Sequence, residues 1–311
     1  MALYMGIDVG GTAVKGIIID ENGRAVAENS VATATGNALA GCIETLADRL
    51  VAATGTVFSK IAGIGVCCPG MIDSGTGTVI FAGNLNLENY PLKKLLEEKF
   101  QREVAVCNDA NAAALGEAKF GAGKGFSDSV LITLGTGVGG GIVIGGKLFE
   151  GNKSAGAEIG HMVIERGGHK CTCGRRGCFE VYCSARALTE KTKQAMEDDT
   201  SSEMWKTYSY DTADGRTAFE YMDCDRAARQ VADWYLKYLA CGVANIANIF
   251  RPQIIMIGGG VAAQGTRITA PLQRLVDGEL FGGTEYAPVK IVCAALGVKA
   301  GAYGAAALNM R

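Results

Sequence analysis

The sequence has few prolines and histidines, little net charge and no long apolar run. It contains 5 prolines and 2 histidines in 311 residues, and its formal net charge is −2. Such a balance gives no electrostatic basis for binding nucleic acid or an anionic membrane. No apolar stretch reaches the roughly 20 residues of a membrane-spanning helix, and MALYMGIDVGG lacks the basic and apolar regions of a signal peptide. We therefore expect a cytoplasmic protein with no nucleic-acid and no membrane partner.

Glycine is abundant, with 44 residues, and hydrophobic residues make up 48% of the chain. This composition is typical of an α/β protein with many tight turns, and the length suffices for two domains. Eleven cysteines would suggest disulfides in a short secreted chain, but a reducing compartment is expected here. Cys183 and Cys224 stay ambiguous. Six other cysteines in apolar surroundings are expected to act as small buried hydrophobes: Cys42, Cys67, Cys68, Cys107, Cys241 and Cys293.

The apolar runs and helical periods predict strands and helices in alternation. Residues 3–20 and 129–149 share one plan, in which an apolar run, a glycine turn and a second apolar run follow one another. We interpret this as an internal duplication, which predicts two similar lobes facing across a cleft. Further strands are predicted at IAGIGVCCPG, REVAVCND, PQIIMIGGGVA and VKIVCAAL. Helices are predicted at 37–54, at LKKLLEEKF, directly after Asp109, over much of 185–250 and at the C-terminus.

Three glycine turns follow apolar strands: Gly10-Gly11-Thr12, Gly135-Thr136-Gly137 and Gly258-Gly259-Gly260. Glycine lets backbone N–H groups approach an anion closely, although strand turns also use glycine for shape alone. None of the three matches GxxxxGK[ST] or a GxGxxG that opens a helix. Lys15 follows the first turn and suits either a phosphate contact or a solvated strand position. Together the turns favour a polyphosphate held by two of them, with the third near the nucleoside.

The segment HMVIERGGHKCTCGRRGCFE, residues 161–180, combines both histidines with three cysteines. Cys171, Cys173 and Cys178 have the spacing CxCx₄C, and thiolates with one imidazole are the preferred ligands of a structural zinc ion. Proximity in sequence favours His169 as the fourth ligand. However, an extended residue two positions before Cys171 would approach the metal from the same side as Cys171. His161 is therefore the alternative.

The segments DVGGTAVKG, LGTGVGGGIVI, IGGG, AGAEIGH and CTCGRRGCFE resemble those of the ROK family of bacterial sugar kinases and repressors, in the actin-like ATPase superfamily. The resemblance covers essentially the whole chain. It implies an α/β fold of two lobes, the actin-like ATPase (ribonuclease H-like) fold, with a zinc-binding loop. The expected lobes are 1–116, on which a helix at about 297–311 packs back, and 117–296 with the zinc motif. A homodimer is also implied.

The resemblance also implies the roles of particular residues. Zinc is expected on His161, Cys171, Cys173 and Cys178, which leaves His169 as a solvated loop residue. Four protein ligands leave no open position, so zinc would stiffen the loop and perform no chemistry. The sugar is expected to contact Asn84, Asn108, Asp109, Glu158, His161 and Glu180.

Asp109 matches the catalytic base of the family, which accepts the proton of a sugar hydroxyl and holds its oxygen in line with the γ-phosphate of ATP. From the pattern alone, an Asp between a strand and a helix is more often an N-cap, and Asn84 is more often a turn residue. Mg²⁺ is expected near Asp8, through water. The groups expected around ATP are Asp8, Gly10, Gly11, Thr12, Lys15, Gly135, Thr136, Gly137, Gly258, Gly259 and Gly260.

The implied function is ATP-dependent phosphorylation of a hexose, with the glucokinase reaction of glycolysis as the first expectation. Many glucokinase members carry a Trp three residues after the Asn that matches Asn84, whereas this chain has Leu87. Kinases for allose, fructose or N-acetylmannosamine therefore stay open. A family repressor would carry an added helix-turn-helix domain, which we do not expect because the kinase pattern starts at Asp8; the acidity also disfavours DNA. The zinc segment disfavours an actin-like filament or chaperone ATPase.

Overall fold

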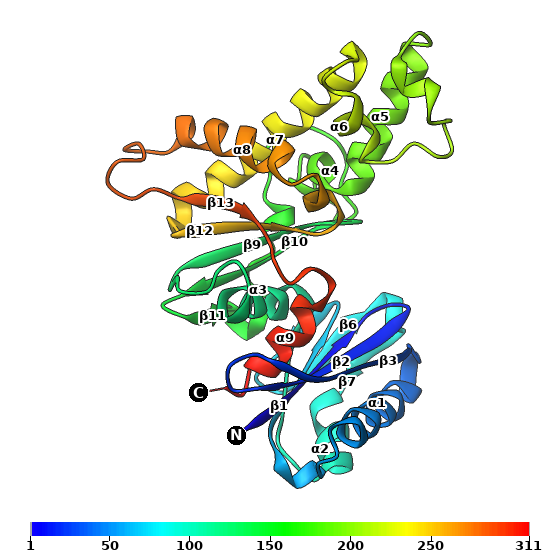
Figure 1. Cartoon of the computed structure of the whole chain (residues 1–311), viewed down its shortest axis with the longest axis vertical. Helices are drawn as coiled ribbons and strands as arrows, with labels where there is room; N and C mark the ends of the chain where they lie inside the picture. The colour runs from blue at the N-terminus through cyan, green and yellow to red at the C-terminus, as the bar shows by residue number, and fades with distance from the viewer. Residues whose placement is uncertain (1, 311) are drawn as a thin grey trace. The chain divides into compact units, whose positions relative to one another are not determined.

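The computed structural model describes residues 2–310. Two groups of elements build it (Figure 1). The strands are β1 (Leu3–Val9), β2 (Ala13–Asp20), β3 (Ala25–Ala32), β4 (Ile61–Cys68), β5 (Met71–Asp73), β6 (Thr78–Ala82), β7 (Leu87–Tyr90), β8 (Val104–Asn108), β9 (Ser129–Leu134), β10 (Val138–Ile144), β11 (Lys147–Phe149), β12 (Ile254–Gly258) and β13 (Lys290–Cys293). The α-helices are α1 (Leu39–Thr54), α2 (Leu92–Phe100), α3 (Asp109–Phe120), α4 (Glu180–Cys183), α5 (Ala185–Asp198), α6 (Thr217–Tyr221), α7 (Arg226–Phe250), α8 (Thr266–Glu279) and α9 (Ala300–Ala307).

The chain forms two compact units. Unit 1 contains the residues up to Leu131, Gly141–Ala157 and the residues from Ala295 onward; unit 2 contains Ile132–Gly140 and Glu158–Ala294. The boundary between them crosses β9 and β10. By packing, residues 117–131 and 141–157 therefore group with the first unit. The lobe boundary at residue 116 that the sequence suggested stays a proposal.

The first sheet has the strand order β3-β2-β1-β4-β8. β1 pairs antiparallel with β2 and parallel with β4, and β4 pairs parallel with β8. A separate small sheet has the order β5-β6-β7. Because the carboxyl ends of β1, β4 and β8 point the same way, the residues that follow these strands gather at one edge of the sheet. That edge carries Asp8, Cys68 and Asn108.

The two faces of this sheet pack against different helices. On one face, the buried side chains of Met5, Ile7 and Val9 join those of α1 and α2 in one hydrophobic core. Helix α1 contributes Leu39, Ile43, Leu46 and Leu50, all fully buried, with the i, i+4, i+7 spacing that predicted a helix over 37–54. Successive side chains of a strand alternate between faces. The residues between these, Gly6 and Asp8, therefore belong to the opposite face.

The opposite face is covered by α9, whose sequence AGAYGAAA is almost entirely small residues (Figure 1). A Cβ atom added to Gly6 would lie 1.9 Å from the carbonyl oxygen of Ala302, and one added to Gly65 would lie 1.9 Å from that of Ala305. A Cβ atom added to Gly304 would lie 1.6 Å from the carbonyl oxygen of Ala112 in α3. Backbone contacts this close exclude any side chain, which explains the glycines at these positions.

The second sheet has the order β11-β10-β9-β12-β13. In both sheets the third, second, first, fourth and fifth strands, counted along the chain, lie side by side. β10 and β11 are antiparallel, as are β2 and β3. β12 and β13 are parallel, as are β4 and β8. The internal duplication that residues 3–20 and 129–149 predicted is confirmed by this topology, which is that of the ribonuclease H-like α/β fold.

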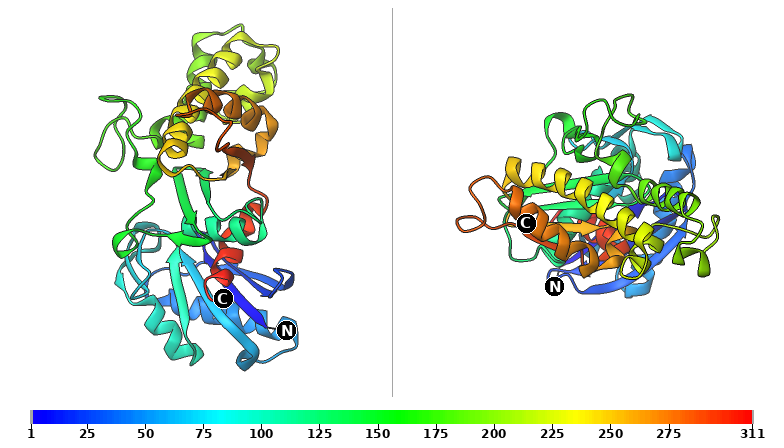
Figure 2. Two further views of the ribbon diagram at one scale, coloured as in Figure 1. Left: turned by 90° about the vertical axis from the view of Figure 1, so that its left-hand side faces the viewer. Right: turned by 90° about the horizontal axis from the view of Figure 1, so that it is seen from above.

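Unit 2 is rich in helices. The longest, α7, has 25 residues and packs against α5, α6 and α8 (Figure 2). No helix among residues 2–310 is long and apolar enough to cross a bilayer.

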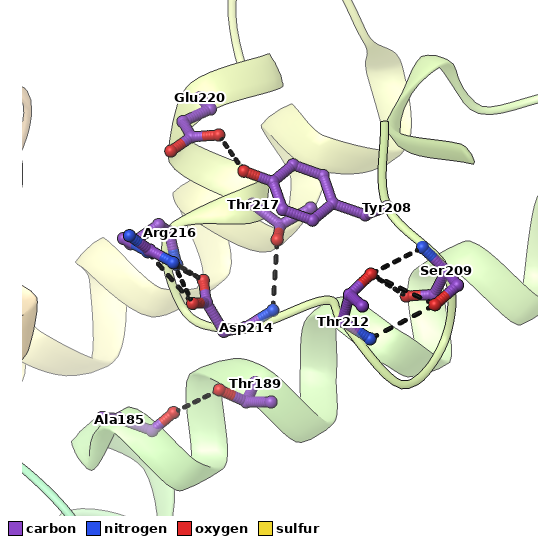
Figure 3. Close-up of polar contacts among 9 residues, drawn as sticks. All are labelled: Ala185, Thr189, Tyr208, Ser209, Thr212, Asp214, Arg216, Thr217 and Glu220. Atoms are coloured by element: carbon purple, nitrogen blue, oxygen red, sulfur yellow. Dashed lines mark hydrogen bonds and ion pairs between the residues drawn. The ribbon is translucent and has the colours of Figure 1, made fainter. Parts of the chain in front are cut away.

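The polar, weakly patterned stretch near 196–215 is ordered by local hydrogen bonds (Figure 3). Thr217 Oγ1 accepts from the backbone N–H of Asp214 at 3.1 Å, and the Asp214 carboxylate pairs with the Arg216 guanidinium at 2.8 Å. The Tyr208 hydroxyl donates to Glu220. Pairs as exposed as these contribute little to stability, so they shape the loop more than they stabilise the fold.

Candidate active site and metal centre

The first glycine turn, between β1 and β2, is anchored on both sides. The N–H of Gly10 donates to the carbonyl oxygen of Ala13 at 3.1 Å, and the Thr33 hydroxyl donates to the carbonyl oxygen of Gly10 at 2.7 Å. A Cβ atom on Gly10 would lie 2.8 Å from the Ala13 oxygen, so the turn needs glycine there. Gly11 and Thr12 are exposed at its tip. The turn is thus held rigidly, with its tip open to a ligand.

Asn84 lies beside this turn. It stands in the short 3₁₀ helix Gly83–Leu85 and is exposed. A Cβ atom built on Gly11 would lie 3.7 Å from Asn84 Nδ2, although the two residues are far apart in sequence. The structure therefore brings Asn84 to the first glycine turn, where its amide can meet a polar ligand.

Asp8 ends the apolar run of β1, with Lys15 opposite it on β2 and Cys67 beside it on β4. The Cys67 thiol donates to Asp8 Oδ1 at 3.4 Å. The pKa of Asp8 is raised, chiefly by burial. The hydrogen bond from Cys67 and the charge of Lys15 lower it, whereas the negative charge of Asp109 raises it further. Burial raises the pKa of the Cys67 thiol well above its usual range, so this thiol is a neutral donor. Asp8 is a partly desolvated carboxylate at the open end of the sheet.

Asn108, and not Asp109, is the N-cap of α3. Asn108 Oδ1 accepts from the backbone N–H groups of Ala110 and Asn111 at 2.9 and 3.2 Å, and its Nδ2 donates to the carbonyl oxygen of Gly70 at 3.1 Å. The pattern-based expectation that Asp109 caps the helix is therefore wrong. Because β8 ends in Asn108, the amide oxygen of this residue accepts from the first free N–H groups of α3, one position before Asp109.

Asp109 is the first residue of α3 and is half-buried. Its Oδ1 accepts from the N–H of Ala110 at 2.9 Å. Burial raises the pKa of Asp109, while hydrogen bonds from the backbone of Ala110, from its own backbone N–H and from the Asn108 side chain lower it. The net shift is upward. A carboxylate with a raised pKa, not needed as a cap, is suited to accept a proton.

Two acidic groups, Asp8 and Asp109, lie near enough for the charge of one to raise the pKa of the other. A divalent cation near Asp8 would offset this repulsion. Carboxylate oxygens are the ligands that Mg²⁺ prefers, usually with several waters retained. The donor set therefore fits Mg²⁺ brought in with a nucleotide.

In unit 2, four side chains meet as a possible metal centre: His161, Cys171, Cys173 and Cys178. Their ligand atoms all lie within 4.8 Å of one another. Cys173 Sγ is 3.7 Å from Cys178 Sγ, and Cys171 Sγ is 3.7 Å from His161 Nδ1. Tetrahedral zinc with Zn–S bonds of about 2.3 Å requires ligand separations of roughly 3.8 Å. The arrangement therefore fits one zinc ion with four protein ligands.

Glycines shape the loop that carries the thiols. Gly174 and Gly177 have φ angles of +88° and +78°, which residues with side chains rarely adopt. A Cβ atom on Gly177 would lie 1.7 Å from the carbonyl oxygen of Glu165. The N–H of Cys171 donates to the carbonyl oxygen of Arg175 at 2.9 Å, which folds the chain back on itself. These turns bring thiols distant by up to seven residues to one point.

His169 lies outside this cluster, as an exposed residue. Its ring lies 5.2 Å from that of Tyr182, and its backbone N–H donates to the Tyr182 hydroxyl at 3.0 Å. Tyr182 in turn stacks on Tyr238 with ring centroids 4.3 Å apart. His169 is thus held against an aromatic cluster, and the geometry groups His161 with the thiols.

Glu180 connects the cysteine cluster with the second glycine turn. Its Oε1 lies 3.9 Å from Cys171 Sγ, and its Oε2 accepts from the N–H of Val138 at 3.1 Å. A Cβ atom on Gly137 would lie 2.4 Å from Glu180 Oε2, so a side chain there would displace this carboxylate. Glu158 is exposed, three residues before His161, and its carbonyl oxygen accepts from the N–H of His161 at 3.1 Å.

The second and third glycine turns are neighbours. Gly259 follows β12 with a φ of +82°, and a Cβ atom there would lie 2.3 Å from the carbonyl oxygen of Leu134, which ends β9. The carbonyl oxygen of Gly135 accepts from the N–H of Ala185 at 2.8 Å, where α5 begins. The third turn therefore lies against the end of β9, directly before Gly135 of the second turn.

Two buried polar residues were not found from the sequence. The sequence predicts Cys67 to be a small buried hydrophobe, yet its thiol donates to Asp8. Glu117 in α3 is fully buried, and its carboxylate accepts from the N–H groups of Ala122, Ala295 and Leu296 at 2.9, 3.0 and 2.6 Å. These hydrogen bonds hold Ala295 and Leu296, which precede α9, against α3. No local pattern distinguishes either residue, because their partners are distant in sequence.

Comparisons with known proteins agree with this fold and these segments. The ROK family model matches residues 4–311. A glucokinase of Streptomyces coelicolor is 36% identical over 99% of this chain and 98% of its own length. The crystal structure of a ROK family glucokinase from Streptomyces griseus, in complex with glucose and AMPPNP, superposes with a TM-score of 0.81 at 35% identity, covering 99% of both chains.

A xylose repressor of Bacillus spizizenii is 30% identical over 89% of this chain, which corresponds to 69% of the repressor. The similarity to these proteins extends through both units, and the family model spans the glycine turns, Asp109 and the cysteine segment. The chain belongs to the ROK family.

Proposed function

We propose that this protein is an ATP-dependent sugar kinase that converts glucose to glucose 6-phosphate. The similarity to glucokinases over nearly the full chain supports the reaction class. The observation that carries the proposal is Asp109, a half-buried carboxylate whose pKa is raised by burial and whose helix is capped by another residue. A carboxylate spared from capping is available to the substrate.

Asp109 would act as the general base. It would accept the proton of the 6-hydroxyl and hold that oxygen in line with the γ-phosphate. The transition state of phosphoryl transfer is loose, so the proton leaves late and a carboxylate is basic enough. Its raised pKa brings Asp109 nearer to the working pH, which is the direction that favours general base catalysis.

The sugar-binding roles are proposed for Asn84, Asn108, Glu158, His161 and Glu180, with Asp109. Asn84 is exposed beside Gly11, and Asn108 directly precedes Asp109, with its side chain held by the carbonyl oxygen of Gly70. If His161 binds zinc through Nδ1, its Nε2 is left to meet a hydroxyl. Zinc on His161 and the three cysteines would then stiffen a substrate loop and take no part in the chemistry.

The nucleotide is proposed to contact the three glycine turns, with Thr12, Lys15 and Thr136 beside them. Backbone N–H groups at the exposed tip of the anchored turn, those of Gly11 and Thr12, would meet phosphate oxygens without rearrangement. Mg²⁺, when bound with ATP near Asp8, would neutralise charge on the phosphates. Water must be kept from the γ-phosphate, since it would compete with the sugar as acceptor. We also propose a cytoplasmic homodimer on family grounds.

Other assignments are kept. Leu87 stands where many family glucokinases have Trp, so allose, fructose or N-acetylmannosamine are alternative acceptors. Polyphosphate is an alternative donor. The similarity to a xylose repressor keeps a sugar-responsive regulator as the second candidate function.

The test is a coupled assay of purified protein with Mg²⁺, a panel of hexoses, and ATP or polyphosphate as donor. We expect turnover on glucose with ATP, and ADP release without sugar at a far lower rate. Asp109→Asn serves as the matched inactive control. Faster turnover on another sugar would reassign the substrate. Sugar binding by calorimetry without any phosphorylation would instead favour the regulator.

A further inference from the structure

Among the side chains that the proposed mechanism does not use, Cys67 lies nearest to it. The strand register places Cys67 of β4 directly beside Asp8 of β1 on one side and beside Cys107 of β8 on the other. Both cysteines are buried and pack with Ala112 of α3 and Ala305 of α9. The three side chains therefore form a row under the two helices, with the acidic one at its end.

The Asp8 carboxylate is confined from two sides. Its Oδ1 accepts from the Cys67 thiol at 3.4 Å. On the other side, a Cβ atom built on Gly301 would lie 2.8 Å from Asp8 Oδ2 and 2.8 Å from Asp8 Cγ. Cys67 is 0% exposed, so no solvent water competes with Asp8 for the thiol hydrogen. The carboxylate thus lies between a fixed donor and the backbone of α9.

We propose that Cys67 is a positioning residue that orients the Asp8 carboxylate toward the Mg²⁺ of the nucleotide complex, with Gly301 as the opposing wall. The inference rests on the proposed function, because that function assigns Asp8 to the metal. Asp8 is also repelled by the charge of Asp109, so a fixed donor restricts the rotation that this repulsion would otherwise favour. Without the thiol, the carboxylate keeps its charge but loses its set orientation.

The chain offers a matched control in Cys107. It is 1% exposed, stands next to Cys67 across the sheet, and donates its thiol to the carbonyl oxygen of Asn108 at 3.3 Å. Cys107→Ala creates a cavity of the same size as Cys67→Ala, but leaves the bond to Asp8 intact. Cys67→Ser restores a donor, since a hydroxyl can replace the thiol.

The experiment measures metal binding in two ways. One is the Mg²⁺ concentration for half-maximal turnover; the other is the dissociation constant of Mn²⁺, followed by electron paramagnetic resonance with the protein and a non-hydrolysable ATP analogue. For Cys67→Ala we expect both constants to rise about 3- to 10-fold, the size of one lost hydrogen bond of ordinary strength, since a thiol is a weak donor. The KM for sugar should not change. Cys67→Ser should return both constants to within about twofold of the wild type.

Equal metal constants in Cys67→Ala and Cys107→Ala would overturn the proposal, as would a serine variant no better than the alanine variant. If Cys67→Ala does not fold, Gly301→Ala tests the same carboxylate by crowding it from the other side, and unchanged Mn²⁺ binding there would overturn the proposal. A wild type that binds Mn²⁺ with the analogue but phosphorylates no sugar contradicts the proposed function alone. A wild type that binds no Mn²⁺ with the analogue contradicts both.

Discussion

Asp109→Asn should lower turnover strongly while leaving the fold at least as stable as the wild type. Asn has the size of Asp, and its Oδ1 can still accept from the N–H of Ala110. It cannot accept a proton. General base catalysis is typically worth ~10²–10⁴-fold, or about 3–5 kcal/mol of transition-state stabilisation at ~1.4 kcal/mol per decade. Sugar affinity should stay close to that of the wild type.

The stability prediction follows from the sign of the pKa shift. Burial raises the pKa of Asp109 above its ordinary value, so the ionised form is less favourable in the folded than in the unfolded chain. The contribution of this group is fully present below its unfolded pKa and is lost as the pH rises through its folded pKa. Asn does not titrate, so it removes this unfavourable contribution at neutral pH. A favourable helix-dipole contribution of ~0.3–1 kcal/mol from the charge is lost in return. The net change in melting temperature should be zero or slightly upward.

The matched control is Asp225→Asn at the start of α7. There burial acts to raise the pKa, but hydrogen bonds from Ala228, Glu203, Ser202 and Ala227 outweigh it and the pKa is lowered. This carboxylate is therefore a structural cap, which accepts from the N–H groups of Ala228 and Glu203 at 2.7 Å each. Asn can still cap α7 through Oδ1, but its Nδ2 cannot accept from the N–H of Glu203, and the loss of that bond should destabilise the fold by roughly 1 kcal/mol and spare kcat.

Steady-state kinetics, calorimetry of sugar binding and thermal unfolding at several pH values check both variants. Near-normal kcat in folded Asp109→Asn would refute the assignment of the base and move the search to Glu158. A clear fall in its melting temperature would refute the argument that burial disfavours the charge. A loss confined to sugar affinity would leave Asp109 with positioning alone.

Further predictions concern the metal, the pH and the glycines. Cys171→Ser or His161→Ala should release a zinc ion that elemental analysis finds in the wild type, whereas His169→Ala should retain it; release by His169→Ala would mean that the ligand set is wrong. The acid limb of the kcat profile should lie above the ordinary Asp range near ~3.9, since the pKa of Asp109 is raised; a limb at or below that range would contradict the role of burial. Gly304→Ala should cost ~3 kcal/mol of unfolding free energy in denaturant titrations, because its Cβ would lie 1.6 Å from the Ala112 oxygen and the backbones of α3 and α9 must separate. Gly36→Ala is the comparison, because a Cβ there meets open space, and it should cost only ~1 kcal/mol for its positive φ. Gly259→Ala should raise the KM for ATP more than that for sugar, because a Cβ there displaces the third turn from the end of β9; equal changes in both constants would count against a nucleotide role.

Local features of the chain were predictable from the sequence because their causes are local. The period of Leu39, Ile43, Leu46 and Leu50 predicted α1, and one buried face suffices to specify a helix. The repeated apolar run, glycine turn and apolar run predicted an internal duplication, and the two five-stranded sheets share one strand order. The CxCx₄C spacing brought three thiols together, because glycines at 174 and 177 permit the turn that this spacing needs.

Other features depended on contacts between distant parts of the chain. Asn108 and Asp109 are both able to cap a helix, and only the path of the chain after β8 decided that Asn108 does so. Spacing favoured His169 as the histidine near the thiols, and the family resemblance was needed to prefer His161, which the fold places there. From its place in a helix alone, Glu117 would be expected to be solvated. In the fold it accepts from the N–H of Leu296, which is far away in sequence.

The sequence by itself determined the family, the alternation of strands and helices, the positions of the glycine turns and the set of chemical groups available. These follow from residue type and short-range spacing. The tertiary structure alone decided which of those groups are partly desolvated and what each one contacts. The pKa of Asp8 and Asp109 is raised because helices and strands far away in sequence exclude water from them, and Cys67 faces Asp8 because β1 and β4 pair in one register. Burial and strand register are properties of the whole fold, and no segment of the sequence encodes them alone.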